Sequence, residues 1–121
     1  MNKLFLYGRI ASDLELKQTK NNKNYLIFRF AVNNKKNDKT DFIPLIAWER
    51  NATFIKQWAD KGSALLLECF LSINKYIDKT GALRSCINFN VQDVTLLETT
   101  ETLNNRREKN KNKITTINQN S

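Results

Sequence analysis

The strongest strand signal in this chain is the stretch Tyr25-Leu26-Ile27-Phe28-Arg29-Phe30-Ala31-Val32-Asn33. Its even-numbered side chains are all large and apolar, whereas its polar side chains occur only at odd positions. Successive side chains of a β-strand point to opposite faces, so this period of two predicts a strand with one face in a hydrophobic core. The other face is left available for a partner.

Four more segments are rich in β-branched and aromatic residues and are separated by polar or glycine-containing connections. They span residues 3–10, 41–48, 63–73 and 85–97. Between the third and fourth strands in chain order, one short helix is predicted at residues 51–62. We expect Asn51 to cap its start and Gly62 to end it in the left-handed conformation. The helical face assigned to the core carries, at i, i+3 and i+4 spacing, Ile55, Trp58 and Ala59.

Three strands, one helix and two strands therefore follow one another within about a hundred residues. This order predicts an all-β domain with one short helix, a five-stranded Greek-key barrel whose helix covers one end. The chain has 121 residues, enough for one hydrophobic core. The apolar pattern stops after Leu97, so we expect the domain at residues 1–98 and a disordered polar tail at residues 99–121.

The chain is strongly basic, with 20 Lys and Arg against 12 Asp and Glu, for a formal charge of +8. Residues 1–97 hold 15 basic and 9 acidic side chains, so the excess belongs mainly to the predicted domain. This balance indicates a polyanionic partner such as a nucleic acid. For any single lysine, an ordinary solvated surface position is the alternative.

The sequence lacks residues that several other classes of function require. There is no His, and no pair of carboxylates has the spacing of a metal site, which argues against a nuclease and against a metal or other cofactor. Cys69 and Cys86 lie 17 positions apart, so two buried reduced thiols are expected instead of a zinc site or disulfide. Without a signal peptide or membrane-spanning stretch, the protein is expected to be cytoplasmic and to have no membrane partner.

Aromatic residues near lysines are the candidate binding residues. Proteins that bind single strands stack bases on aromatic rings and hold phosphates with cations. The candidate stacking residues are Phe42, Trp48 and Tyr76. Tyr76 lies in the Lys-containing segment 75–81, where a core role is harder to arrange. Phe42 and Trp48 share one strand face, and their spacing alone leaves core packing open as the alternative.

A series of short stretches also follows the order and spacing of a known family: Asn2–Ile10, Asp13–Lys17, Phe28–Asn33, Asp41–Trp48, Lys61–Ser63 and Leu67–Glu68. Together they resemble the bacterial and phage single-stranded DNA-binding protein family, whose domain is an OB-fold. The resemblance covers about residues 1–98. It implies that bases stack on Phe42, Trp48 and Tyr76. It also implies phosphate contacts at the basic residues Lys17, Arg50, Lys61 and Lys75.

The sequence departs from the family pattern in three places. Leu14 replaces a usual Pro and Cys69 replaces a usual Gly of the fourth strand, so the local strand geometry is expected to differ. Lys35 and Lys36 occupy the loop in which the family often has another stacking aromatic. Binding is therefore expected to depend more on charge and to be strongly sensitive to salt.

The resemblance further implies a homo-oligomer, with a tetramer favoured, that takes part in DNA replication, recombination or repair. Family members from cells end in a short acidic tip that recruits replication and repair proteins, whereas this chain ends in Asn120-Ser121. Recruitment through such a tip is not expected. This favours a phage, plasmid or other mobile-element version, or a truncated chain.

One alternative function is an OB-fold accessory protein of the primosome or recombination machinery, acting mainly through protein–protein contacts. The missing tip and the missing loop aromatic favour it. RNA is the alternative ligand, because base stacking and phosphate contacts do not read the 2′-hydroxyl.

Overall fold

The alternating stretch lies within β3 (Asn24–Asn34), and its side chains Leu26, Phe28 and Phe30 are at most 2% exposed. Ile27 and Arg29 between them are exposed, as the period of two predicts. The computed structural model describes residues 1–97 and 107–108. The other elements are β1 (Leu4–Ile10), β2 (Lys17–Gln18), β4 (Lys39–Trp48), α1 (Arg50–Trp58), β5 (Ala64–Ile77) and β6 (Leu83–Leu96).

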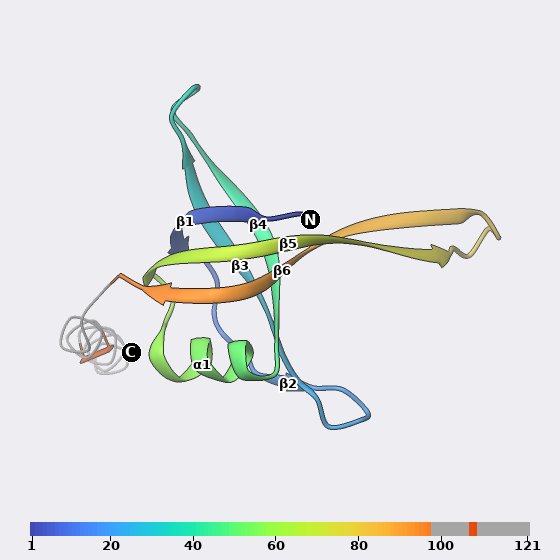
Figure 1. Cartoon of the computed structure of the whole chain (residues 1–121), viewed down its shortest axis with the longest axis horizontal. Helices are drawn as coiled ribbons and strands as arrows, with labels where there is room; N and C mark the ends of the chain where they lie inside the picture. The colour runs from blue at the N-terminus through green and yellow to red at the C-terminus, as the bar shows by residue number, and fades with distance from the viewer. Residues whose placement is uncertain (98–106, 109–121) are drawn as a thin grey trace, which may run out of the picture.

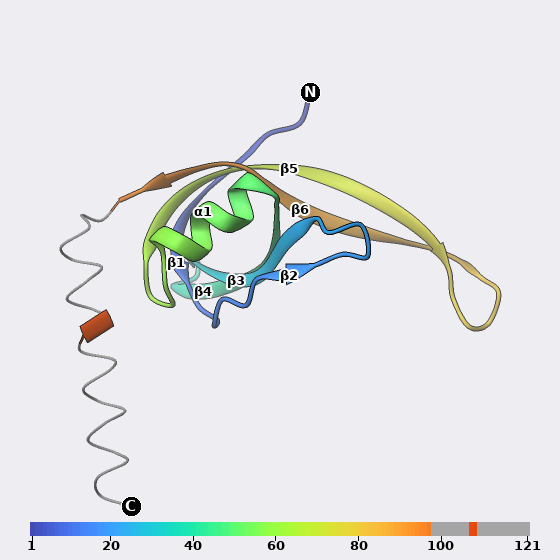
Figure 2. The same ribbon diagram turned by 90° about the horizontal axis from the view of Figure 1, so that it is seen from below.

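Five strands close into a barrel in the order β1, β5, β6, β4, β3 and back to β1 (Figures 1 and 2). Neighbours are antiparallel except β4 and β6, which run parallel where Ile46 faces Asn90. β1 returns to β3 through two residue pairs, at Arg9 and Ile10. The predicted five-stranded Greek-key barrel with one short helix is therefore confirmed. The two-residue strand β2, which lies beside β3, is an addition that the sequence does not predict.

The helix α1 lies across one end of the barrel (Figure 1), and its own side chains Ala52 and Ile55 are buried in the core. Its start differs from the prediction, because the N-cap position is Glu49 and Asn51 lies inside the first turn. The amide nitrogen of Asn51 instead reaches across to β6. There Nδ2 donates to the carbonyl oxygens of Val91 and Gln92, both at 3.2 Å. Asn51 thus ties the helix to the barrel wall instead of capping it.

The end of the helix also differs from the prediction. The helix stops at Trp58, and the backbone becomes extended at Ala59. Gly62 has the left-handed φ of 97°, but it lies in the following turn, where its amide donates to the carbonyl oxygen of Ile10 at 2.7 Å. The core assignment holds for Ile55 and Ala59 and is wrong for Trp58, which is 38% exposed. Trp58 is the last residue of the helix, and its side chain is partly exposed to solvent instead of being buried in the core.

β5 and β6 are longer than predicted and form a hairpin that projects beyond the barrel (Figures 1 and 2). Their pairing continues out to Ile77 and Leu83. The outer parts of both arms are exposed on both faces. At the ends of the arms, residues 74–77 and 83–86, apolar and polar residues do not alternate, so no strand pattern marks these ends in the sequence.

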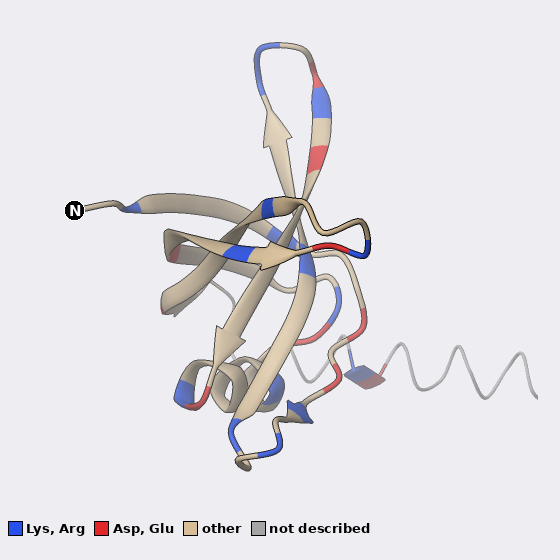
Figure 3. Ribbon diagram, turned by 90° about the vertical axis from the view of Figure 1, so that its right-hand side faces the viewer, with Lys and Arg blue, Asp and Glu red and all other residues tan. Residues whose placement is uncertain are grey.

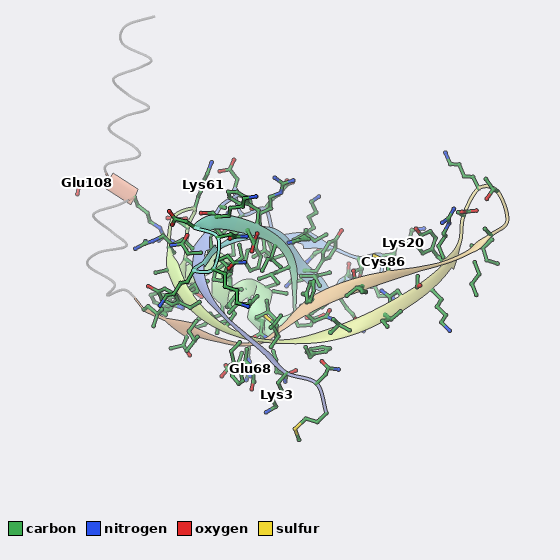
Figure 4. All side chains as sticks on the ribbon, turned by 90° about the horizontal axis from the view of Figure 1, so that it is seen from above. Lys3, Lys20, Lys61, Glu68, Cys86 and Glu108 are labelled. Atoms are coloured by element: carbon green, nitrogen blue, oxygen red, sulfur yellow. The ribbon has the colours of Figure 1, made fainter. Side chains whose placement is uncertain are left out.

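The two thiols lie in different environments. Cys69 is fully buried beside a register shift between β5 and β6, so the residue that replaces the usual Gly lies at an irregularity of the pairing. Burial, with a further contribution from the charge of Glu68, raises the pKa of the Cys69 thiol to about 11. Cys86 is a free, exposed thiol on the hairpin arm of β6 (Figure 4). The expectation of a buried thiol is therefore wrong for Cys86, which lies outside the core.

Two further sequence predictions concern Leu14 and the segment after the barrel. Leu14, which replaces the usual Pro, packs against the core, and Lys56 Nζ donates to its carbonyl oxygen at 2.8 Å. Of the predicted tail, only Arg107 and Glu108 are described, and the prediction of disorder lies outside the described residues. Arg107 Nε donates to Asp60 Oδ2 at 2.5 Å. Within residues 1–97 and 107–108, no helix is long and apolar enough to cross a membrane.

Candidate nucleic-acid interface

The outer face of β4 carries two of the three predicted stacking residues. Phe42 is 58% exposed and Trp48 is 39% exposed. Leu45 and Ala47, which alternate with the outward residues, are buried in the core. The core alternative is therefore excluded for Phe42 and Trp48. Their rings lie on one outer face, with Pro44 between them along the strand.

Trp48 has an aromatic neighbour that the sequence analysis did not single out. It faces Tyr25 on β3, and the two ring centroids are 5.3 Å apart with an interplanar angle of 35°. Tyr25 in turn faces Lys17 on β2. Directly opposed residues of antiparallel strands share a face, so one cation and two aromatic rings form a row across three strands. The predicted site residue Lys17 thus lies in the same row as Trp48.

The predicted basic residues Lys35 and Lys36 lie in the turn that joins β3 to β4. The amide of Lys36 donates to Asn34 Oδ1 at 3.1 Å, a local bond that fixes the turn. Lys35 also lines a cleft of about 270 Å³, which includes the exposed ring of Tyr7 on β1. Figure 3 shows basic and acidic segments interleaved along this hairpin. Both lysines therefore lie beyond the Phe42 end of β4.

The third predicted stacking residue lies on the projecting hairpin. Tyr76 is 52% exposed and faces Arg84 on β6, whereas Lys75 faces Ser85. Consecutive strand residues point to opposite faces, so Lys75 and Tyr76 do not share a face of the hairpin. The cation that does share a face with Tyr76 is Arg84, which the sequence analysis did not select.

Arg84 is held by the turn at the end of the hairpin. Its Nε donates to Asp78 Oδ2 at 2.8 Å, while the amide and hydroxyl of Thr80 donate to Asp78 Oδ1 at 2.9 and 2.6 Å. These hydrogen bonds, that of Arg84 first, lower the pKa of Asp78 to about 2. At neutral pH the carboxylate is therefore ionised and fixes the Arg84 guanidinium.

The last two predicted phosphate contacts lie on different parts of the barrel. Arg50 begins α1, two residues after Trp48, and lines a cleft of about 200 Å³ that also includes Asp93. Lys61 is exposed in the turn between α1 and β5, at the end of the molecule opposite the tip of the β5–β6 hairpin (Figure 4). The predicted residues therefore extend along the molecule and do not form one cluster.

Arg29 is a further exposed cation that the sequence analysis did not select. It faces Pro44 across the β3–β4 pair, and so shares the outer face on which Phe42 and Trp48 lie. The alternation within β3 already predicts that Arg29 points outward. Its partner on β4 depends on the register, which the sequence pattern of one strand does not specify.

This arrangement supports non-covalent binding. Among the described residues, no group of three or more His, Cys, Asp or Glu side chains could hold a metal ion. A closed five-stranded barrel of this strand order with a short helix is an OB-fold, a class whose outer strand face and connecting loops bind oligonucleotides and oligosaccharides. Tyr25, Arg29, Phe42 and Trp48 lie on such a face, on strands β3 and β4.

Comparisons with known proteins agree with this class. The single-strand binding protein family model matches residues 1–97. The single-stranded DNA-binding protein of Onion yellows phytoplasma is 35% identical over 101 residues, which cover 81% of this chain and 95% of that protein. That of Streptococcus mutans is 33% identical over 86 residues, covering 67% of this chain. The chain spans about half (52%) of this streptococcal relative.

The fold has a solved counterpart in the mitochondrial single-stranded DNA binding protein Rim1 from S. cerevisiae, with a TM-score of 0.64 and 18% identity. The match covers 80% of this chain and 95% of that one. This chain belongs to the single-strand binding protein family.

Proposed function

We propose that this chain binds single-stranded DNA without strong sequence preference. The observation that carries the proposal is the pair of exposed rings, Phe42 and Trp48, on one face of β4, with Tyr25 and Lys17 in the row of Trp48. Every base has a π-face, so stacking contributes about 1–3 kcal/mol per base without reading the base edges. Such a binder would serve DNA replication, recombination or repair by covering exposed single strands.

Phosphates are expected on the cations around this platform. Lys35 and Lys36 lie beyond its Phe42 end, and Lys17 and Arg50 lie near its Trp48 end. The other proposed phosphate contacts are Lys75 on the projecting hairpin and Lys61 at the opposite end of the barrel, and Tyr76 on the hairpin is the third proposed stacking residue. A strand that reaches all of them wraps around the barrel instead of crossing it once.

We also propose a homo-oligomer, with a tetramer favoured. β1 meets β3 at only two residues, so in the described part of the chain Leu4–Gly8 have a strand neighbour, β5, on one side alone. Phe5 and Tyr7 on this strand are 63% and 64% exposed. A free strand edge with exposed aromatic side chains favours pairing with a second copy. Sedimentation equilibrium measures the assembly, and a monomer at all concentrations would refute this part of the proposal.

The binding proposal is tested by titrating intrinsic tryptophan fluorescence with poly(dT). The chain has two tryptophans, so a Trp58→Phe variant leaves Trp48 as the single reporter. We expect strong quenching by poly(dT), weak binding of the matching duplex, and a log affinity that falls by about 0.7 per phosphate contact per log unit of salt. The same titration with poly(rU) measures the discrimination against RNA. A folded protein that neither quenches nor binds would refute the proposal.

A matched pair of variants locates the site. Trp48 and Trp58 are almost equally exposed, at 39% and 38%, but Trp58 lies at the end of α1 and outside the proposed site. Trp48→Ala is expected to weaken poly(dT) binding by about 1–3 kcal/mol, and Trp58→Ala to leave it unchanged. Affinity is measured by fluorescence anisotropy of a labelled oligonucleotide. Equal losses in the two variants would contradict a site on β4.

A protein-binding accessory role is the second candidate, and it is favoured by Lys35 and Lys36 in the β3–β4 turn, which replace a stacking aromatic of the family pattern. One measurement distinguishes DNA binding from the accessory role. A folded protein that fails to occupy poly(dT) at physiological salt would leave the accessory role as the better proposal.

A further inference from the structure

A cleft of about 210 Å³ opens between β4 and the hairpin arm of β6. Its lining is mainly apolar and comes from three strands: Ile27, Pro44, Leu45, Ile46, Cys86, Ile87, Asn88 and Phe89. None of these residues belongs to the stacking platform or to the proposed phosphate contacts. The cleft therefore requires its own explanation.

Strand geometry accounts for the opening. β4 and β6 meet at one residue pair, Ile46 and Asn90. On the hairpin side of that pair, β6 leaves β4 and continues with β5 into the projecting arm (Figure 2). Pro44 precedes this pair on β4, and Ile87 precedes it on β6. These two residues consequently line the two walls of a gap.

The walls expose apolar surface to solvent. Ile27 is 55% exposed and Ile87 is 56% exposed, although both are β-branched residues that favour burial. Two polar residues, Asn88 and Cys86, also line the cleft. Apolar walls with a few polar groups favour a ligand that has flat apolar faces and a polar edge. A nucleobase has this chemistry.

The cleft also lies beside the path proposed for the DNA. Phe42 and Trp48 are six residues apart on β4, which at the rise of a strand is about 20 Å. Stacked bases follow one another at about 3.4 Å, so the bases on these two rings are not neighbours in the strand. The nucleotides between them must pass Pro44 and Ile46, which lie on the same face and line the cleft.

We propose that this cleft binds one unstacked base of the bound strand, and thymine in preference to uracil. This inference rests on the proposed function. The cleft has the volume of about seven liquid waters, which accommodates a single base. The 5-methyl group of thymine contacts the isoleucine side chains of the walls. Burial of one methyl group favours thymine over uracil by about fourfold.

The test compares oligo(dT) with oligo(dU) of equal length and uses a matched pair of hairpin variants. Ile73 and Ile87 face each other across β5 and β6 and are 57% and 56% exposed, but only Ile87 lines the cleft. In wild type, oligo(dT) is expected to bind about fourfold tighter than oligo(dU). Ile87→Ser should bring this ratio close to one, whereas Ile73→Ser should preserve it. Ile27→Ser, on the opposite wall, should behave like Ile87→Ser.

Each outcome bears on the proposal. The inference is overturned if the ratio is unchanged in Ile87→Ser and Ile27→Ser, or if Ile73→Ser lowers it equally, while wild type still binds oligo(dT). In that case the proposed function stands without a base in the cleft. If folded wild type fails to bind oligo(dT), the proposed function itself fails. Thermal unfolding midpoints equal to that of wild type establish that the variants are folded.

Discussion

Replacing Gly8 by alanine should weaken the seam that closes the barrel. A Cβ at this position would lie 2.1 Å from the carbonyl oxygen of Ala31 and 3.1 Å from Cε2 of Phe30. The oxygen belongs to the backbone of β3, so β1 must move away by roughly an ångström to restore an ordinary contact. Overpacking of this kind costs about 1–3 kcal/mol, and a lost seam hydrogen bond adds about 1 kcal/mol. The lower backbone entropy of alanine offsets about 0.5–1 kcal/mol.

We therefore expect Gly8→Ala to lose about 2–3 kcal/mol of unfolding free energy, which lowers the Tm by roughly 10–20 °C in a domain of this size. Urea denaturation followed by circular dichroism measures the loss. Gly81→Ala is the control, because no atom lies within 4 Å of its added Cβ but its φ is +84°. That variant should lose only the conformational cost of about 1–2 kcal/mol. A Gly8→Ala protein within 0.5 kcal/mol of wild type would refute the steric account of the seam.

Four further predictions follow from single side chains. The carboxyl of Asp78 should titrate by NMR with a pKa of about 2, because the Arg84 and Thr80 hydrogen bonds favour its ionised form. These hydrogen bonds stabilise the fold fully above the pKa that Asp78 has in the unfolded chain, about 3.9. Their contribution should disappear as the pH falls through 2. At pH 8, a thiol reagent should label Cys86 alone, and Cys69 only after unfolding. Because the folded pKa of Cys69 is raised to about 11, the unfolding free energy should also fall between pH 9 and 11. Asn51→Asp should unfold at lower urea than Asn51→Ala, since its carboxylate would face two carbonyl oxygens.

The sequence predicts those parts of the fold in which burial imposes a period. Leu26, Phe28 and Phe30 alternate because one face of β3 fills the core, and this pattern alone locates the strand. The hairpin arms are different, because their outer residues pair through the backbone while both side-chain faces are exposed. Hydrogen bonds between backbones require no particular side-chain pattern, so the extension of β5 to Ile77 has no signal in the sequence.

Helix ends were predicted poorly for a related reason. Asn51 is a favourable N-cap residue, but its amide forms two hydrogen bonds with β6 that exist only in the folded barrel. Trp58 has the helical spacing of a core residue, yet the helix stops there and its ring remains 38% exposed. At Asn51, local propensity gives way to contacts between segments that lie far apart in the chain.

The candidate site, too, could be predicted only in part from the sequence. Spacing assigned Phe42 and Trp48 to one face but could not say which, because the pattern of β4 is apolar on both sides. The pairing with β3 decides this, since Leu45 and Ala47 follow the buried side of the neighbouring strand and turn the two rings outward. Tyr25 and Arg29 join the site only through that pairing, which no single segment encodes.

Exposure is what makes these residues both difficult to predict and suited to binding. A buried ring such as Phe28 is held in place by its neighbours and belongs to an alternating sequence pattern, but it has no exposed surface that a ligand could contact. Phe42 and Trp48 are exposed, yet they lie on a strand whose opposite face is packed in the core, so their backbone positions are fixed before any ligand arrives. Binding to such a platform requires little ordering of the backbone.

Tyr76 lies on an arm without a buried face, so contacts with this ring must include the cost of ordering the arm. The barrel platform is therefore the part of the proposed site that should provide most of the affinity.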